Sequence, residues 1–305
     1  MNDMEKILSG KPLAKLIRSW VKELIAEHGL SPKMLLIQTG SDPASAYYVQ
    51  NIVSSGAKLG CDVRLMNLPE DISQAYLQEL IASANDDPDI HGIMLQKPLP
   101  HHLDEALAGE SISPDKDIDC LNPVNQGRIV LNQDALPPCT PLAVLCTLRY
   151  YGIPVAGKHT VIIGRSAVVG KPLANMLLWK KSWANASVTV CHSRSENLGE
   201  LTRSADILIA ALGKAEFVKP DIIKNNSVLI DVGINAHNSA DGKGSFVGDI
   251  DYNACFDKAL AITPVPGGIG SVTTSLLWLN LLKAALAAKG TNKKIDDFLD
   301  FIFKD

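Results

Sequence analysis

The sequence predicts an α/β protein of two α/β domains, the second built on a Rossmann-like, doubly wound parallel sheet. Three observations predict this class. Short apolar runs typical of strands alternate with helical segments along the 305 residues, which is the pattern of βαβ units. A proline-rich segment at 137–141 interrupts this series, and a second series follows it. In the second series a strand, a glycine turn and a helix start follow one another around Gly164.

The first series opens with an amphipathic helix over 12–28, whose apolar residues from Leu13 to Ile25 form one stripe. Helices are also predicted at 44–59 and 73–85, and they lie between strands at 33–38, 61–66 and 90–95. The segment Pro137–Pro141 is expected to open a linking helix that ends near Tyr151.

The second series predicts strands at 159–163, 187–190, 206–210, 227–231 and 260–263. The uncharged stretch 259–282 is long enough to span a bilayer, but prolines and glycines between Pro264 and Gly270 interrupt it, so we expect a loop and then a buried helix. The tail, 293–305, has apolar residues at helical spacing (Ile295, Phe298, Leu299, Ile302) and is expected to pack on the body. The predicted domains are 1–142, completed by 275–305 through a C-terminal helix that returns to the first domain, and 143–274.

Composition narrows the class of partner. With 46% hydrophobic residues, 20% charged residues and a net charge of −4, the chain has nothing that attracts nucleic acid or an anionic membrane, and a small-molecule substrate fits better. The six cysteines form no CxxC pair, so neither a metal site nor a disulfide framework is indicated. The N-terminus lacks the basic and apolar regions of a signal peptide, and a cytoplasmic location is expected.

The glycine turn after the first strand of the second series indicates a dinucleotide site. Gly164, Arg165, Ser166 and Gly170 lie where backbone amides and a helix N-terminus can hold a pyrophosphate. Ser166 and Val169 stand in place of the second and third glycines of the usual fingerprint, so an ordinary tight turn is the alternative. After the next strand come Ser193 and Arg194 in place of an acidic residue, which favours NADP over NAD because two guanidinium groups can bind a 2′-phosphate. Both arginines being merely solvated is the alternative.

Five stretches, taken together and in order, resemble the methylenetetrahydrofolate dehydrogenase/cyclohydrolase family: 43–49, 92–100, 114–119, 164–166 and 264–270. The match runs from about Gly10 to Leu282. The resemblance implies a folate-binding catalytic domain over 1–142 and 275–305 and an NADP-binding domain over 143–274. It also implies NADP-dependent oxidation of methylenetetrahydrofolate to methenyltetrahydrofolate, hydrolysis of that product to 10-formyltetrahydrofolate, a place in one-carbon metabolism and purine biosynthesis, and a homodimer.

The resemblance also assigns site residues. Asp119 looks like the carboxylate that accepts two parallel N–H donors of the pterin, although an aspartate in such a loop is usually a turn former. Tyr48 is similar to the tyrosine that packs on the substrate rings, with Tyr47 the structural alternative. Gln96 ends an apolar strand, where α/β sheets bind ligands, with a buried glutamine whose hydrogen bonds are satisfied within the protein as the alternative. Further substrate-binding residues are Pro266, Gly267 and Gly268, and Ile234 joins the cofactor-binding set.

Three positions depart from the family. Ile52 shares a helix face with Tyr48 where the family has its acid/base lysine, and Lys58 lies about 120° around the helix. Cys120 replaces a usual glycine. Ser271 replaces a usual proline, and it is expected to be tolerated as a helix cap.

Because hydride transfer mainly needs positioning, whereas hydrolysis needs an acid/base, we predict a dehydrogenase with weak or absent cyclohydrolase activity. Three alternatives stay open. One is a full bifunctional enzyme that uses another group, such as a water held by Gln96. The others are a silent folate- or nucleotide-binding paralogue and a dehydrogenase for another substrate.

Overall fold

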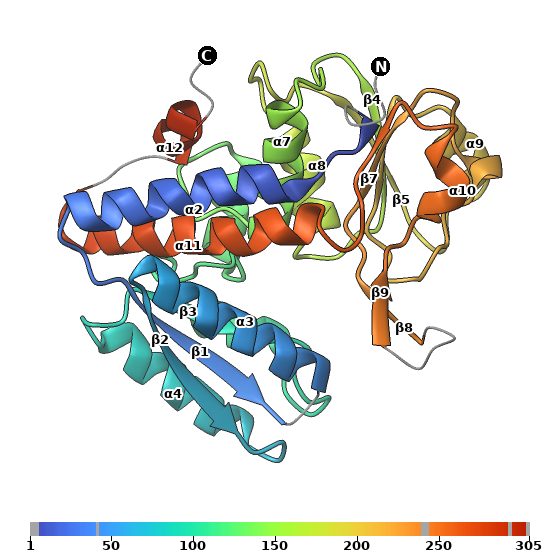
Figure 1. Cartoon of the computed structure of the whole chain (residues 1–305). Helices are drawn as coiled ribbons and strands as arrows, with labels where there is room; N and C mark the ends of the chain where they lie inside the picture. The colour runs from blue at the N-terminus through green and yellow to red at the C-terminus, as the bar shows by residue number, and fades with distance from the viewer. Residues whose placement is uncertain (1–5, 41–42, 239–243, 292–294, 303–305) are drawn as a thin grey trace. The chain divides into compact units, whose positions relative to one another are not determined.

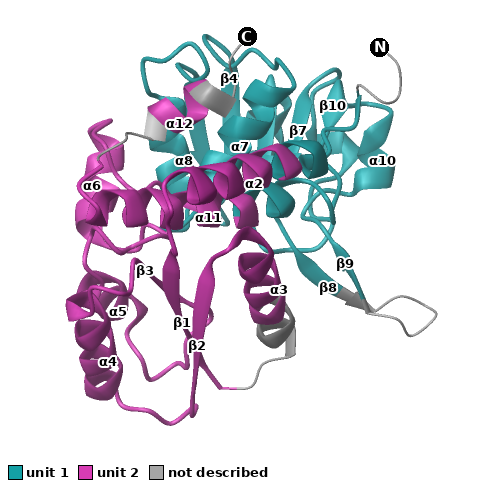
Figure 2. Cartoon of the chain, turned by 60° about the vertical axis from the view of Figure 1, so that its left-hand side comes forward, with its two compact units in different colours: residues 1–14, 140–273 teal, residues 15–139, 274–305 magenta. Residues whose placement is uncertain are grey.

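The computed structural model describes residues 6–40, 43–238, 244–291 and 295–302, with the side chains of 43–48, 237–238, 295–296 and 301–302 excepted. The chain forms two compact units (Figure 2). Unit 1 comprises 1–14 and 140–273, and unit 2 comprises 15–139 and 274–305. The predicted division placed 1–14 with 15–142. In the structure these residues belong with 140–273, because Leu8 donates its N–H to the Ile262 carbonyl and Gly10 donates to Gly267 (2.9 and 2.8 Å).

Unit 2 holds a three-stranded parallel sheet in the order β2-β1-β3 (Figure 1). Its strands are β1 (Lys33–Thr39), β2 (Asp62–Leu68) and β3 (Gly92–Leu95). The helices within the unit are α3 (Pro43–Leu59), α4 (Gln74–Asp86), α5 (Glu105–Ser111), α6 (Pro123–Val130) and α12 (Ile295–Ile302). The predicted strands and both long helices are confirmed to within two residues.

The two faces of this sheet are covered differently. Leu35, Ile37 and Leu95 point to the α4 side, where they join one hydrophobic cluster. On the other face α3 comes close to β2, since a Cβ at Gly56 would stand 2.9 Å from the Val63 side chain. That second face carries the residues discussed below.

Unit 1 holds a five-stranded parallel sheet in the order β10-β7-β6-β4-β5, as expected of a doubly wound fold. Its strands are β4 (His159–Ile163), β5 (Ser187–Cys191), β6 (Ile207–Ala210), β7 (Val228–Asp231) and β10 (Ala261–Ile262). The helices are α8 (Gly170–Leu177), α9 (Leu198–Arg203) and α10 (Tyr252–Phe256), with a 3₁₀ turn at Pro220–Ile222. An antiparallel hairpin that the sequence did not predict, β8 (Asn235–Asn238) and β9 (Gly244–Val247), follows β7.

Two long helices, α2 (Gly10–Glu27) and α11 (Ile269–Ala288), each contribute residues to both units. Helix α7 (Cys139–Tyr150) belongs to unit 1 except for its first residue. Helix α11 is long and apolar enough to cross a membrane, but 78% of its most apolar 18-residue stretch is buried inside the protein. The predicted loop followed by a buried helix is therefore confirmed. In unit 2 the tail packs as expected: Phe298 is 1% exposed and meets the Trp20 ring edge-on at 5.2 Å.

Candidate functional site

Gln96 lies at the carboxyl edge of the unit 2 sheet, directly after β3. Its backbone N–H donates to the carbonyl of Ile37 on β1 (2.8 Å), which extends the sheet by one residue. The side chain is 8% exposed, and its Nε2 donates to the carbonyl of Lys97 (2.8 Å). Its Oε1 is buried and has no hydrogen-bond partner among the described residues. A buried acceptor left unpaired costs about 1–3 kcal/mol, so a donor from a ligand would suit it.

Asp119 lies in a loop that other side chains hold rigidly. The loop joins the sheet through a bridge between Ile93 and Asp117. The buried Asp117 carboxylate accepts the N–H groups of Leu121 (2.8 Å) and Asn122 (2.9 Å). From α11, Asn280 Nδ2 donates to the carbonyl oxygen of residue 118 (2.9 Å). Asp117 thus shapes the loop and leaves the neighbouring carboxylate available.

The electrostatic surroundings of Asp119 are unusual for an aspartate. Burial raises its pKa to about 7, and the nearby Asp117 carboxylate adds to the increase. Lys97 and a hydrogen bond from the Cys139 thiol act in the opposite direction. A carboxylate with this pKa changes its charge near neutral pH, so two N–H donors from a ligand would favour its ionised form.

Cys120, where the resembled family has glycine, takes a left-handed backbone conformation with φ +58°. Glycine adopts this conformation without steric cost, and an L-residue does so at about 1–2 kcal/mol. The loop therefore keeps the shape that glycine permits. Gln126 Nε2 donates to the Cys120 carbonyl (2.6 Å) and helps to hold it.

Ile52 is fully buried, at 0% exposure, on the face of α3 that covers the sheet. Gly56, one turn later, is so close to Trp278 that a Cβ would stand 2.7 Å from its ring. Lys58 is exposed, so it lies on a different face of α3, as predicted. Tyr48 falls one turn before Ile52, and its side chain lies outside the described residues.

Lys97 and Cys139 are two residues beside Asp119 whose proximity the sequence did not indicate. Lys97 Nζ forms an ion pair with Glu105 Oε2 at 3.0 Å, and about a third of its side chain is exposed. The Cys139 thiol is buried, and burial raises its pKa well above its usual value, so it is present as a neutral donor.

In unit 1, the turn after β4 brings backbone segments unusually close together. Gly164 has φ +135°, and a Cβ there would stand 2.1 Å from the Ala211 carbonyl oxygen. A Cβ at Gly170 would stand 2.1 Å from the Gly164 carbonyl oxygen. These two positions therefore require glycine, whereas Ser166 fits at the second fingerprint position, where its Oγ accepts the N–H of Val169 (3.1 Å). The turn leads directly into α8, whose first-turn amides can face a phosphate.

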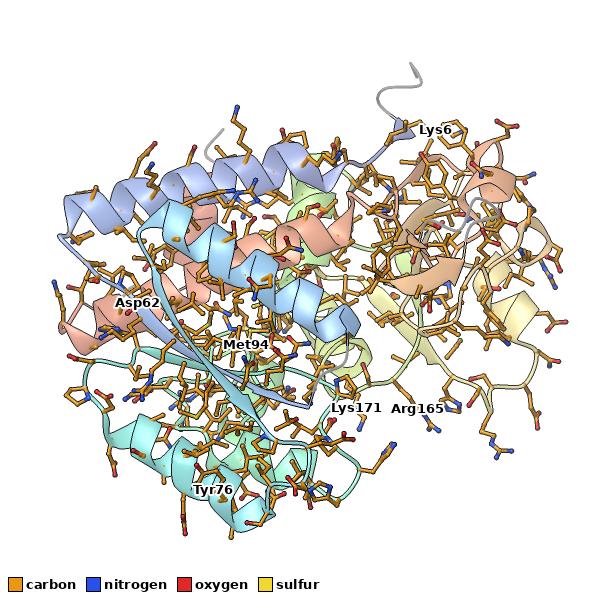
Figure 3. All side chains as sticks on the ribbon, turned by 60° about the horizontal axis from the view of Figure 1, so that its bottom comes forward. Lys6, Asp62, Tyr76, Met94, Arg165 and Lys171 are labelled. Atoms are coloured by element: carbon orange, nitrogen blue, oxygen red, sulfur yellow. The ribbon has the colours of Figure 1, made fainter. Side chains whose placement is uncertain are left out.

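The residues predicted to bind the cofactor follow the carboxyl ends of neighbouring strands. Arg165 follows β4, whereas Ser193 and Arg194 follow β5, its partner in the sheet. All three are exposed, as is Ile234, at 65%, after β7. Figure 3 labels Arg165 together with Lys171 in the first turn of α8, and both side chains project from the ribbon. The cluster is basic, which suits an anionic ligand.

The Pro266–Gly268 loop packs against the start of α2. A Cβ at Gly10 would stand 2.1 Å from the Gly268 carbonyl oxygen, and Gly267 has φ +103°. The loop leads into α11, which begins at Ile269. The expectation that Ser271 caps this helix is wrong, because it lies inside the first turn, where its N–H donates to the Gly268 carbonyl (3.2 Å).

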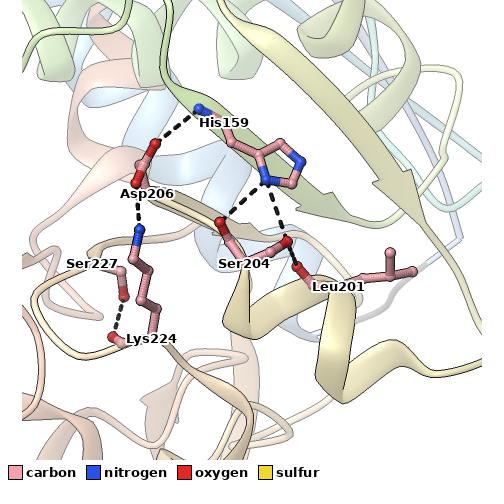
Figure 4. A network of polar contacts seen from close by, with 6 residues as sticks. All are labelled: His159, Leu201, Ser204, Asp206, Lys224 and Ser227. Carbon is pink, nitrogen blue, oxygen red and sulfur yellow. Dashed lines mark hydrogen bonds and ion pairs between the residues drawn. The ribbon is translucent and has the colours of Figure 1, made fainter.

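A serine, a histidine and an aspartate also meet at the amino ends of β4 and β6 (Figure 4). The His159 ring lies 3.3 Å from Ser204 Oγ and 2.9 Å from Thr189 Oγ1. Asp206, however, accepts the backbone N–H of His159 (3.1 Å) and pairs with Lys224 (2.6 Å), so this carboxylate does not orient the ring. These contacts connect the amino ends of neighbouring strands, at the edge of the sheet opposite the turn at Gly164. Among the described residues, no three His, Cys, Asp or Glu side chains gather as a metal site would require.

Known proteins match the chain along most of its length. The model of the tetrahydrofolate dehydrogenase/cyclohydrolase catalytic domain matches residues 8–119, and the model of that family's NAD(P)-binding domain matches 138–289. The bifunctional protein FolD of Alkaliphilus oremlandii is 44% identical over 285 residues, which cover 92% of this chain and 97% of that protein.

Solved structures agree. The bifunctional FolD methylenetetrahydrofolate dehydrogenase/cyclohydrolase of Campylobacter jejuni superposes with a TM-score of 0.86 at 37% identity, covering 92% of this chain and 98% of that one. The Trypanosoma brucei methylenetetrahydrofolate dehydrogenase-cyclohydrolase, solved with NADP cofactor and an inhibitor, gives 0.86 at 32% identity, covering 93% and 98%. The resemblance first indicated by five short stretches therefore extends over nearly the whole chain, and the chain belongs to the tetrahydrofolate dehydrogenase/cyclohydrolase family.

Proposed function

We propose that this protein is an NADP-dependent methylenetetrahydrofolate dehydrogenase whose cyclohydrolase activity is weak or absent. The observation that carries the proposal is Ile52, a fully buried aliphatic side chain at the position of the family lysine. Three features of the described residues support the remainder of the proposed site. Gln96 Oε1 is buried and has no hydrogen-bond partner among the described residues, burial raises the pKa of the Asp119 carboxyl to about 7, and the close-packed backbone turn at Gly164 suits a pyrophosphate.

Substrate binding is assigned to polar groups of unit 2. The Asp119 carboxylate would accept the ring N–H and the exocyclic amine of the pterin, which are two parallel donors. Gln96 Oε1 would accept a further donor or face the charge that develops on the substrate. Tyr48 would pack on the flat rings, and Pro266–Gly268 would border the reacting carbon. These roles rest on the family resemblance, on the burial of Gln96 and on the raised pKa of the partly buried Asp119 carboxyl.

The nucleotide is assigned to the carboxyl edge of the unit 1 sheet. Gly164, Ser166 and Gly170 would hold the pyrophosphate with the amides of α8, and Arg165, Ser193 and Arg194 would bind a 2′-phosphate. Ile234 would border the nicotinamide side. Bound there, NADP supplies the hydride acceptor.

The two half-reactions make different demands on the chain. Loss of hydride from the bridging methylene is assisted by the neighbouring nitrogen lone pair and gives a cationic methenyl product. This step needs positioning, and a neutral Ile52 adds no repulsion to the developing cation. Hydrolysis adds water to the cation and moves protons while a ring opens, and a positioned acid/base contributes about 10²–10⁴-fold to such steps. Ile52 has no proton to exchange.

A direct test supplies purified protein with methenyltetrahydrofolate and follows the loss of its absorbance. The proposal expects decay at the uncatalysed rate, together with rapid NADPH formation when methylenetetrahydrofolate and NADP are supplied instead. Rapid enzymatic decay would favour a full bifunctional enzyme in which a water held by Gln96 or another group replaces the lysine. Absence of NADPH formation would favour the silent paralogue or a dehydrogenase for another substrate.

We further infer a homodimer in the cytoplasm, acting on small-molecule folates. Support for the dimer comes from family resemblance. Support for the location comes from the reduced state expected of six scattered cysteines. Light scattering at the concentration of the activity assay tests the dimer.

A further inference from the structure

Asp249 is a fully buried carboxylate in unit 1. It accepts hydrogen bonds from backbone that follows the carboxyl edge of the sheet, to which the nucleotide is assigned. Its Oδ2 accepts the N–H of Leu212 and of Gly213 (2.9 Å for the latter), and its Oδ1 accepts the N–H of Lys214 (2.8 Å). Asn235 Nδ2 donates to Oδ1 as well (2.9 Å). Three consecutive backbone amides and one side-chain amide therefore converge on a single side chain.

These donors come from the two segments that follow β6 and β7. The turn 211–214 directly follows β6, and Asn235 opens β8, with three residues between it and the end of β7. The turn 211–214 is in contact with the glycine turn that follows β4, because a Cβ at Gly164 would overlap the Ala211 carbonyl oxygen. A shift of 211–214 would therefore change the space at Gly164.

A second buried carboxylate, Asp231, holds the backbone at Asp249 in place. It accepts the N–H groups of Asp249 (2.9 Å), Ile250 (2.8 Å) and Gly233 (3.0 Å). Space around the pair is minimal, since a Cβ at Gly233 would overlap the Asp249 carboxylate and a Cβ at Gly248 would overlap that of Asp231. The Asp249 carboxylate has no room to turn away from its donors.

We propose that Asp249 is a positioning residue for the nucleotide. It touches no ligand itself, and it sets the turn 211–214 and Asn235 so that the carboxyl edge of β4, β6 and β7 accepts NADP. The inference rests on the proposed NADP-dependent function. A carboxylate at position 249 can hold all four donors, because both of its oxygens accept hydrogen bonds. An amide of the same shape has only one oxygen, and its NH₂ group would face two of the donors.

The test is Asp249→Asn, with Asp251→Asn as the matched control. Asp251 lies two residues along, caps α10 through the N–H of Ala254 (3.1 Å) and pairs with Lys219 (2.8 Å), so the control also removes a carboxylate with a structural task. In Asp249→Asn two of the four buried donors lose their acceptor, and the turn 211–214 is expected to shift to relieve this. We expect the KM for NADP to rise about tenfold, which corresponds to about 1.4 kcal/mol and lies within the cost of an unpaired buried donor. The KM for methylenetetrahydrofolate should stay within about twofold, because the substrate groups of unit 2 are untouched.

Melting temperatures with and without NADP separate positioning from stability. Asp251→Asn should lower the melting temperature of the free protein but keep the wild-type KM for NADP and the wild-type increase in melting temperature when NADP is added. If Asp249→Asn does not fold, Asn235→Ala removes one of the four donors and should raise the KM for NADP by a smaller factor.

The outcomes distinguish the two proposals. Wild-type protein that neither binds NADP nor reduces it would overturn the proposed function and this inference together. Active wild-type protein with an unchanged KM for NADP in Asp249→Asn, or in Asn235→Ala where that is the variant that folds, would overturn the inference alone. A parallel rise in both KM values would overturn it as well.

Discussion

Replacing Ile52 by lysine tests the proposal that the residue at this position separates the two half-reactions. Helix α3 returns antiparallel to the strands, so positions earlier in the helix lie nearer the carboxyl edge of the sheet. Gly56 lies over Val63, the second residue of β2, and Ile52 is one turn, about 5.4 Å, nearer that edge. With about 3.3 Å per strand residue, Ile52 lies about two strand residues short of the edge where Gln96 is found. A lysine stem of four carbons is suited to cover that gap.

The cost of the substitution follows from burial. If the lysine amine stayed in the space that the Ile52 side chain fills, burial would lower its pKa by up to about 3–5 units. Keeping the amine charged there would cost about 4–7 kcal/mol. Reaching the edge beside Gln96 and Asp119 would reduce this, and we expect the free energy of unfolding to fall by about 2–4 kcal/mol. A typical domain is stable by about 5–15 kcal/mol, so the variant should fold.

Hydrolysis of methenyltetrahydrofolate is the activity to measure. Ile52→Lys should accelerate the decay of its absorbance over the wild type, within the about 10²–10⁴-fold range of a positioned acid/base. Ile52→Met is the matched control, since it fills the site with an unbranched chain but offers no proton, and such core exchanges usually cost below about 1.5 kcal/mol. The control should hydrolyse no faster than the wild type.

A folded Ile52→Lys protein that oxidises methylenetetrahydrofolate but hydrolyses methenyltetrahydrofolate no faster than Ile52→Met would refute the reasoning. It would mean that the missing lysine is not what separates the two activities. Faster hydrolysis by Ile52→Met would refute it too, because a change of packing alone would then suffice.

Three further predictions concern other residues. The proposed contact of Asp119 with the pterin requires the ionised carboxylate, and burial raises the pKa of this group to about 7. The KM for methylenetetrahydrofolate should therefore be about tenfold higher at pH 6 than at pH 8. In Asp119→Asn this KM should be high and should no longer depend on pH. Arg194→Ala should raise the KM for NADP by about 10-fold or more and leave the KM for NAD unchanged, whereas equal effects on both would contradict a 2′-phosphate contact. In urea unfolding, Cys120→Gly should be more stable than Cys120→Ala by about 1 kcal/mol, the reverse of the usual order, because residue 120 has φ +58°; an alanine variant as stable as the glycine variant would argue against that strain.

The elements that local pattern encodes were predictable. Strands β1 and β4 each contain a continuous, buried apolar run, Met34–Ile37 and Val161–Ile163, and both strands were located to within one residue. The hairpin β8–β9 was missed because its residues, among them Asn235 and Gly244, carry no alternating apolar pattern. The assignment of 1–14 to unit 1 was also hidden, since α2 continues through the boundary without any break in its sequence.

Of the candidate site, the backbone geometry that lies within one motif was predictable. Gly164 and Gly170 lie in a single turn, and the structure gives the reason for each, a close backbone contact. Contacts made across the fold were not predictable. Cys139 reaches Asp119 from a separate helix, and Asp249 collects donors from residues 14 to 37 positions away. Only the folded chain brings such groups together.

The product ratio of the purified protein tests the central claim most directly. Methylenetetrahydrofolate and NADP are supplied, and NADPH, methenyltetrahydrofolate and 10-formyltetrahydrofolate are measured over the first turnovers. With Ile52 in place of a lysine, we predict one methenyltetrahydrofolate for each NADPH, with 10-formyltetrahydrofolate appearing only at the uncatalysed rate. Formation of 10-formyltetrahydrofolate in step with NADPH, without accumulation of the methenyl compound, would contradict the account.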